Sequence, residues 1–133
     1  MQTEISPESH AMTLSLPSFY KNLVAVDRSK HLGSGLRGGF GLGFAASINA
    51  VPVNLVEMTQ LSHFYPLGFT TDEDPVPVAI VGLREDENLF IDDDGDWLEG
   101  AYIPSYIRRY PFLFRSEPET ERYIFLVDEE CLE

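Results

Sequence analysis

Cysteine is almost absent from this sequence, and long apolar runs are missing altogether. The chain of 133 residues has one cysteine, Cys131, which excludes an internal disulfide and any metal site built from several cysteines. No apolar run approaches the roughly 20 residues that a membrane-spanning helix needs, so we expect no membrane insertion. The first 22 residues also lack the basic and apolar regions of a secretory signal. We therefore expect a cytoplasmic location, while association with the cell surface by a signal-independent route stays open.

Positive charge is scarce and unevenly distributed. Nine basic residues are set against 22 acidic ones, which gives a formal net charge of −13. Residues 1–50 have a balance of +1, whereas residues 51–133 carry five arginines and nineteen acids, a balance of −14. Nucleic acids and anionic lipids are bound by cationic side chains that replace counterions. This acidic protein is therefore expected to have no nucleic-acid partner.

The remaining composition is that of a folded domain. Hydrophobic residues make up 44% of the chain, with nine phenylalanines and six tyrosines, and this length is enough to bury one core. Residues 1–18 are polar with scattered proline and serine, and we interpret them as a flexible N-terminal tail. Residues 19–131 are expected to form a single α+β domain with a mainly antiparallel β-sheet.

Short apolar runs predict the strands of this sheet. Strands are expected at 23–26, 44–53, 67–70 and 76–83, in a hairpin of 89–92 with 97–103, and in two closing strands at 112–115 and 122–129. The run at 76–83 is rich in β-branched residues, which is typical of a central strand.

Two helices are expected between the strands. A medium helix is predicted at about 54–65, because Asn54 and Glu57 have the spacing of a capping box. One face of this helix would be apolar, with Leu55, Met58, Leu61 and Tyr65. A short helix is predicted at about 104–110, between Pro104, which suits a first turn, and Pro111, which disfavours helical geometry before it.

Residues 31–44, HLGSGLRGGFGLGF, contain six of the ten glycines. Gly33, Gly35 and Gly38 have the G-x-G-x-x-G spacing of loops that wrap the phosphates of a dinucleotide. That fingerprint closes a strand and opens a helix, whereas here DRSKHL precedes the glycines and further glycines follow them. We interpret the stretch as a turn-rich loop, with a lid over a pocket as the alternative, and we expect no cofactor.

Residues 91–100, IDDDGDWLEG, resemble a calcium-binding loop. Placing Gly95 at the sixth position leaves Phe90 at the first and Ala101 at the twelfth, where carboxylates are required. An Asp-Gly hairpin turn explains the stretch without metal. We expect no metal site, since metal-ligand spacing is also lacking among the histidines, which are His10, His31 and His63.

The stretch GAYIPSYIRRYPF, residues 100–112, is the strongest candidate for a binding site. It places Arg108 and Arg109 among Tyr102, Tyr106 and Tyr110, within the acidic part of the chain. Two arginines can form a fork for a carboxylate or phosphate, with the tyrosines as walls and hydroxyl donors. The alternative is that both arginines pair with nearby acids of this chain and the tyrosines pack in its core.

Several stretches together resemble the SapC family of bacterial proteins. They run in order from residue 19 to residue 130, namely FYKNLVAVDRSKH, NAVPVNLVEM, HFYPLGFT, PVAIVGLREDENLFIDDDGDWLEGAYIPSYIRRYPF and IFLVDEE. The block GAYIPSYIRRYPF is the most specific, whereas the glycine-rich GSGLRGG lies outside the pattern. The resemblance implies an accessory protein associated with a surface layer, with no agreed catalytic residues. Members are nearly twice as long, so the chain resembles the N-terminal part of a longer protein.

Two hypotheses from different classes follow. The first is a SapC-like, non-catalytic accessory or binding protein that engages a protein partner or a small anionic ligand through the Arg–Tyr cluster. The second is an enzyme of unknown reaction whose site is completed by an absent C-terminal half, and convergence of the arginines with Glu57 in one deep pocket would favour it. A structural surface component that self-associates is a third interpretation, so formation of a homo-oligomer stays open. Catalytic residues stay unassigned.

Overall fold

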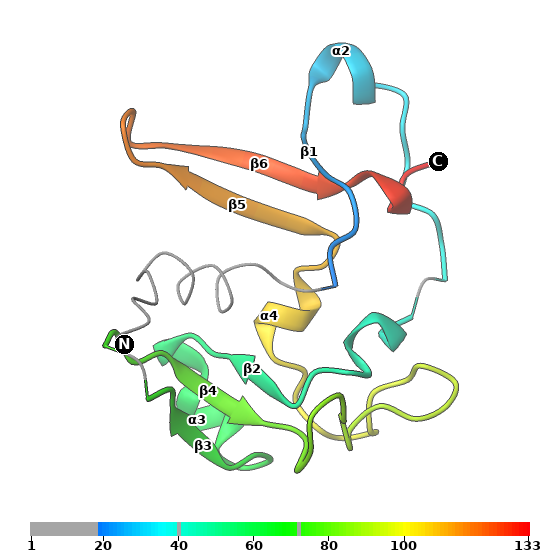
Figure 1. The fold of residues 1–133 in the computed structure, drawn as a ribbon. Helices are drawn as coiled ribbons and strands as arrows, with labels where there is room; N and C mark the ends of the chain where they lie inside the picture. The colour runs from blue at the N-terminus through cyan, green and yellow to red at the C-terminus, as the bar shows by residue number, and fades with distance from the viewer. Residues whose placement is uncertain (1–18, 40, 72) are drawn as a thin grey trace, which may run out of the picture.

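Two small antiparallel sheets with short helices form the fold. The computed structural model describes residues 19–39, 41–71 and 73–133, so the predicted tail at 1–18 lies outside the described residues. Sheet and short helices together confirm the predicted α+β class. Helix α4 (Ser105–Arg108) lies between the two sheets (Figure 1). No helix among the described residues is both long and apolar enough to cross a membrane.

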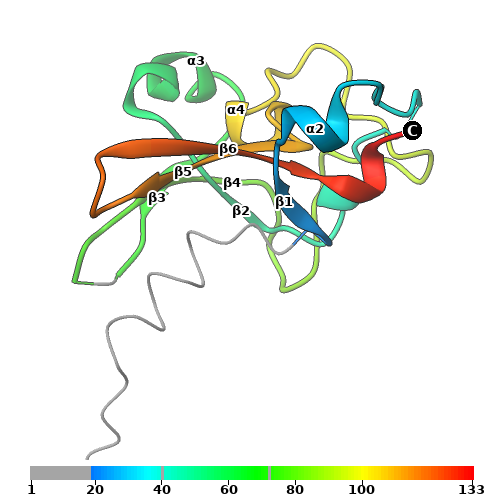
Figure 2. The ribbon, with the colours of Figure 1, turned by 90° about the horizontal axis from the view of Figure 1, so that it is seen from above.

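The first sheet joins the N-terminal strand to the closing hairpin. Its order is β1 (Leu23–Ala25), β6 (Arg122–Asp128) and β5 (Phe112–Glu117), and both pairings are antiparallel. The hairpin turn lies at the opposite end of this sheet from the C-terminal residues, as the view from above shows (Figure 2). The rings of Phe114 and Phe125 stack across the hairpin, and Phe114 is largely exposed. The predicted pair of closing strands is confirmed.

The second sheet is built around the predicted central strand. Its order is β2 (Ala50–Pro52), β4 (Pro77–Ile80) and β3 (Leu67–Phe69), again antiparallel. Strand β4 ends at Ile80, before the predicted residue 83. Beyond it, the backbone at Gly82 passes the Glu87 carbonyl so closely that a Cβ would lie 1.9 Å from its oxygen. Only glycine fits there.

Two predicted β segments are shorter than expected. The predicted strand at 44–53 is wrong in its first half, where residues Gly43–Ala45 form the 3₁₀ helix η1 and Ala45 packs in the core. The predicted hairpin at 89–103 is reduced to one bridge, between Ile91 and Trp97. The Asp92 carboxylate accepts the backbone N–H groups of Asp94 and Asp96, and the backbone bonds from Asp92 to Asp96 and from Leu98 to Phe90 also close the turn.

The helix predicted at 54–65 is wrong in length. It consists of the 3₁₀ turn η2 (Leu55–Glu57) and one turn of α-helix, α3 (Met58–Leu61). Ser62 Oγ donates to the Thr59 carbonyl, and His63 Nδ1 lies 2.8 Å from the same oxygen. Side chains that compete for backbone groups favour the end of a helix.

The expected apolar face and cap of this helix also differ. Leu55 is exposed, so the apolar face that enters the core consists of Leu61, Tyr65 and the half-buried Met58. The predicted capping box is wrong as well, because the Asn54 side chain does not cap the turn. The Glu57 side chain instead bonds to residues of α4 and the segment before it.

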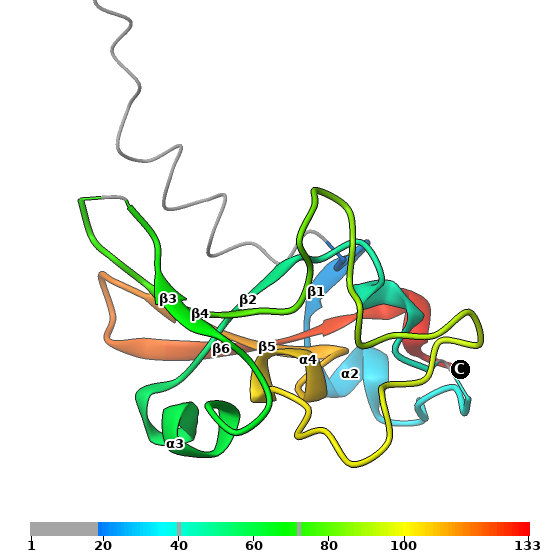
Figure 3. The same cartoon turned by 90° about the horizontal axis from the view of Figure 1, so that it is seen from below.

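The short helix predicted at about 104–110 is confirmed as α4, with two further helical turns elsewhere, α2 (Arg28–His31) and η3 (Glu129–Cys131). Seen from above and from below, α3 and α4 lie on the same side of the second sheet (Figures 2 and 3). Ile107 of α4 is fully buried in the same core cluster as Leu61 and Val51. This packing brings the chain around residue 57 next to the start of α4.

Truncation of Ile107 tests this core. Ile107→Ala should lower the free energy of unfolding by about 2–5 kcal/mol, because a fully buried side chain is removed and a cavity remains. Val56→Ala, at a side chain that is 91% exposed, is the control and should change it by less than about 0.5 kcal/mol. Urea unfolding followed by circular dichroism measures both. Equal effects of the two substitutions would contradict the described packing.

Candidate functional site

A buried carboxylate, Glu57, organises the region around α4. Its Oε1 accepts the Ser105 backbone N–H and the Tyr102 hydroxyl, both at 2.9 Å. Its Oε2 accepts the Ser105 hydroxyl at 2.6 Å. Because the Glu57 side chain is only 8% exposed, these bonds replace the water that an ionised carboxylate requires. Glu57 thereby fixes the start of α4 against η2.

The same bonds determine the ionisation of Glu57. Burial acts to raise its pKa, but the hydrogen bonds from Ser105 and Tyr102 outweigh burial and hold the pKa below the ordinary value. The carboxylate is therefore ionised at neutral pH. The hydrogen bond to this anion in turn raises the pKa of the Tyr102 hydroxyl.

Arg108 belongs to this internal network. Its Nε donates to the Ile103 carbonyl and its Nη2 to the Tyr102 hydroxyl, each at 2.9 Å. The same Nη2 lies 3.5 Å from Glu57 Oε1. The guanidinium carbon is also 5.2 Å from the centre of the Tyr102 ring. Arg108 and Tyr102, two of the predicted ligand-binding residues, thus bind each other and Glu57.

Arg109 has a different environment from its neighbour. Its guanidinium carbon lies 4.2 Å from the centre of the Tyr106 ring. Its Nε is buried and has no hydrogen-bond partner in the part of the chain that the structure describes. Within those same residues, no carboxylate forms an ion pair with Arg109. Burial raises the pKa of Tyr20 to about 12, and the nearby Arg109 guanidinium opposes this rise.

A pocket of about 510 Å³ opens beside Arg109. Asn54 Nδ2 donates to Ser105 Oγ at 3.0 Å, so two of the polar side chains at the pocket are already bonded to each other. Strand β2, the residues after it and α4 supply most of the lining, which consists of Pro52, Val53, Asn54, Val76, Ser105, Tyr106 and Arg109. Of the predicted site residues, Arg109 and Tyr106 line this pocket.

Tyr110 lies in another network. Its hydroxyl donates to Asp128 Oδ2 at 3.1 Å and accepts the Cys131 thiol at 3.2 Å. Burial and these two bonds raise its pKa. Asp128 is fully buried and also accepts the backbone N–H groups of Lys21 and Asn22. The structure therefore divides the predicted five-residue cluster among three environments.

Comparison of the sequence with known proteins identifies the family to which the chain belongs. A family model described as SapC matches residues 26–133. The chain belongs to the SapC family. No curated protein and no solved structure matches it. All seven residues that line the Arg109 pocket lie inside the matched region of this SapC chain.

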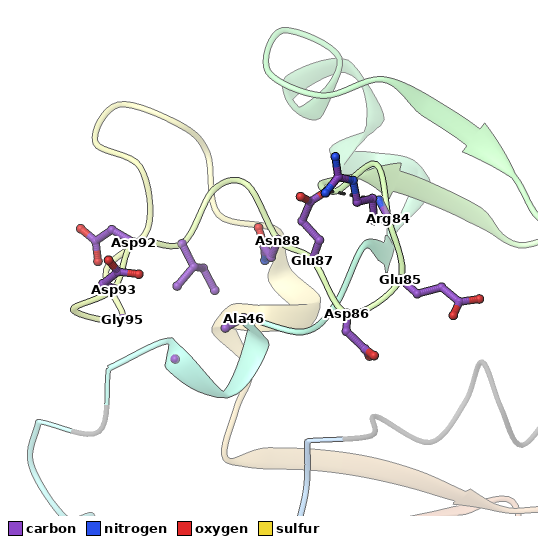
Figure 4. Close-up of a pocket in the computed structure, with 11 residues that line it drawn as sticks. Ala46, Arg84, Glu85, Asp86, Glu87, Asn88, Asp92, Asp93 and Gly95 are labelled. Carbon is purple, nitrogen blue, oxygen red and sulfur yellow. Dashed lines mark hydrogen bonds between the residues drawn. The ribbon is translucent and has the colours of Figure 1, made fainter.

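A second depression, of about 630 Å³, lies between the loops 84–88 and 91–95 of the SapC chain. Its lining includes Asp92 and Asp93 on one side and Glu85 and Asp86 on the other (Figure 4). The carboxylates of Glu85 and Asp86 point away from those of the other two, so they do not converge on one point. The Arg109 pocket is therefore the better candidate, because it presents a cation that forms no ion pair with any carboxylate of the described residues.

Sequence reasoning missed five pocket residues, which are Pro52, Val53, Asn54, Val76 and Ser105. Asn54 and Glu57 carried a local signal, but their spacing indicated a capping box rather than a contact with α4. Val53 and Val76 are far apart in the chain and resemble any other strand residues. No pattern in the sequence signals that they meet at one pocket.

Replacement of Glu57 tests the buried carboxylate of this SapC chain. Glu57→Gln should lower the free energy of unfolding at pH 7 by about 1–3 kcal/mol, since charge-assisted hydrogen bonds are lost. The folded-state pKa of Glu57 is lowered from its ordinary value of 4.5. The contribution of the ionised Glu57 side chain to the free energy of unfolding is therefore fully present above about pH 4.5. It is lost as the pH falls through the folded-state pKa. Urea unfolding at a series of pH values measures this.

The exposed Glu85 provides the matched control. Glu85→Gln should leave the free energy of unfolding within about 0.5 kcal/mol of wild type at pH 7. The difference between wild type and Glu57→Gln should shrink on acidification. A difference that stays constant down to pH 3 would contradict the assigned role of the Glu57 charge.

Proposed function

We propose that this SapC-family chain is a non-catalytic binding protein that holds a small anionic ligand at the Arg109 pocket. The observation that supports this most strongly is the state of Arg109, a cation at a pocket that has no acidic partner among the described residues. Residues 51–133 carry nineteen acids. In such surroundings a purely structural arginine is expected to pair with an acid.

Arg108 provides the internal comparison. It is adjacent in sequence, carries the same charge and forms three contacts with Ile103, Tyr102 and Glu57. Arg109 forms no ion pair with any carboxylate of the described residues. Because its Nε is buried, an external anion would accept charge-assisted hydrogen bonds from the Nη groups of this guanidinium.

A binding role fits the chemistry better than catalysis does. The Ser105 hydroxyl donates a hydrogen bond to the Glu57 carboxylate. A nucleophile and its general base have the same arrangement. A general base works best with a pKa near the operating pH, whereas hydrogen bonding holds the pKa of Glu57 below its ordinary value. A carboxylate in that state is a weak base for a hydroxyl. The Ser105–Glu57 pair is therefore better suited to holding α4 in place.

Two adjacent substitutions test the proposed function. Arg109→Gln should abolish the thermal stabilisation produced by small anions at pH 7, while Arg108→Gln should keep it and lower the melting temperature of the free protein. A ligand at a hundred times its Kd adds about 2.7 kcal/mol, which corresponds to roughly 5–10 °C in a domain of this size. A thermal-shift panel of acetate, longer carboxylates and inorganic phosphate measures this. Equal loss of the stabilisation by anions in both variants, or no stabilisation of the wild type by any anion, would argue against the proposal.

A further inference from the structure

We infer that the Arg109 pocket takes a small monocarboxylate that carries a branched apolar group, rather than a phosphate or a dicarboxylate. This inference rests on the proposed function and adds the chemical class of the ligand. Three features of the pocket lead to it: its single available positive charge, the buried anion behind it, and its apolar wall.

The charges around the pocket match one negative charge. Among the residues that the structure describes, Arg109 is the only cationic side chain in the lining. Ser105, also in the lining, donates to the Glu57 anion at 2.6 Å, and Asn54 lies 3.4 Å from the same carboxylate. Arg108 is already bound to Glu57 and Tyr102. A second negative charge on the ligand would have no cation to pair with and would be repelled by Glu57.

The shape of the available cation favours a planar anion. The Arg109 guanidinium carbon lies 4.2 Å from the centre of the Tyr106 ring, and the guanidinium also interacts with the Tyr20 and Tyr106 hydroxyls. The guanidinium is itself a planar group with several N–H donors. A carboxylate can accept two parallel hydrogen bonds from such a planar fork. The Tyr106 ring then lies beside the bound carboxylate as an apolar surface.

The rest of the lining favours an apolar group on the ligand. Pro52, Val53 and Val76 contribute apolar side chains to the pocket. The hydroxyl of Ser105 and the amide group of Asn54 are already donating, to Glu57 and Ser105 respectively. Few donors are therefore left for a polyhydroxylated or highly polar ligand. A volume of about 510 Å³ is in the range of small-molecule sites and exceeds what acetate can fill.

Isothermal titration calorimetry at pH 7 tests the ligand class with four probes: 4-methylpentanoate, 4-methylpentanamide, acetate and inorganic phosphate. We expect 4-methylpentanoate to bind at least tenfold more tightly than acetate, because each buried methylene contributes about 0.8 kcal/mol, or roughly fourfold in Kd. The amide and phosphate should bind more weakly than 4-methylpentanoate. Arg109→Gln should abolish binding of the carboxylates, and Arg108→Gln should retain it.

The half-buried Val76 provides a variant that tests the apolar wall alone. Val76→Thr keeps the shape of the side chain but places a hydroxyl in the wall. It should weaken 4-methylpentanoate about three- to tenfold and leave acetate unchanged, since only the apolar group is affected.

The outcomes separate this inference from the proposed function. Tighter binding of phosphate than of 4-methylpentanoate, lost in Arg109→Gln, would leave the proposed function standing and overturn the monocarboxylate. Equal affinity for acetate and 4-methylpentanoate would contradict the inference that the ligand carries an apolar group. Failure of every probe to bind in an Arg109-dependent way would overturn both. Binding of 4-methylpentanoate that depends on Arg109 and on Val76 supports both.

Discussion

The hydrogen bonds that the Glu57 carboxylate accepts from Ser105 and Tyr102 are the interaction on which the site depends. They join the turn after β2 to the start of α4, segments 48 residues apart in the chain. Because the carboxylate is nearly excluded from water, it is stable as an anion only while all these donors are in place. This side chain therefore helps to fix the position of α4, and with it that of Arg108 and Arg109.

Helix α4 and its C-cap residue give the two adjacent arginines different surroundings. Consecutive residues of a helix point about 100° apart, so one arginine can face Glu57 while the next faces the pocket. Arg108 bonds to Tyr102, Ile103 and Glu57. Arg109 lies over Tyr106 and beside β2. Adjacent residues of the same chemistry thus differ in whether their charge is already neutralised.

A second buried carboxylate, Asp128, has the corresponding role in the first sheet. It lies at the end of β6 and accepts the backbone N–H groups of Lys21 and Asn22, just before β1. It also accepts the Tyr110 hydroxyl, two residues after α4. Burial acts to raise the pKa of Asp128, but these bonds outweigh it and hold the pKa below its ordinary value. Two buried anions therefore hold the two sheets to the segment around α4, in a chain whose formal net charge is −13.

The sequence by itself determined the α+β class, the central strand β4, the closing hairpin of β5 and β6, and the short helix α4. These features depend on local patterns: β-branched runs, a polar turn between apolar segments, and prolines on either side of a helical turn. It also predicted a binding site within residues 100–112, and Tyr106 and Arg109 of that stretch line the pocket. The tertiary structure alone decided that Glu57 bonds across to Ser105 rather than capping its own helix, and that Tyr110 joins Asp128. It also decided that Val53 and Val76 meet Arg109 at one pocket. The physical reason is that a side chain's partner depends on which segments packing brings together, and neither spacing nor composition records contacts between segments far apart in the chain.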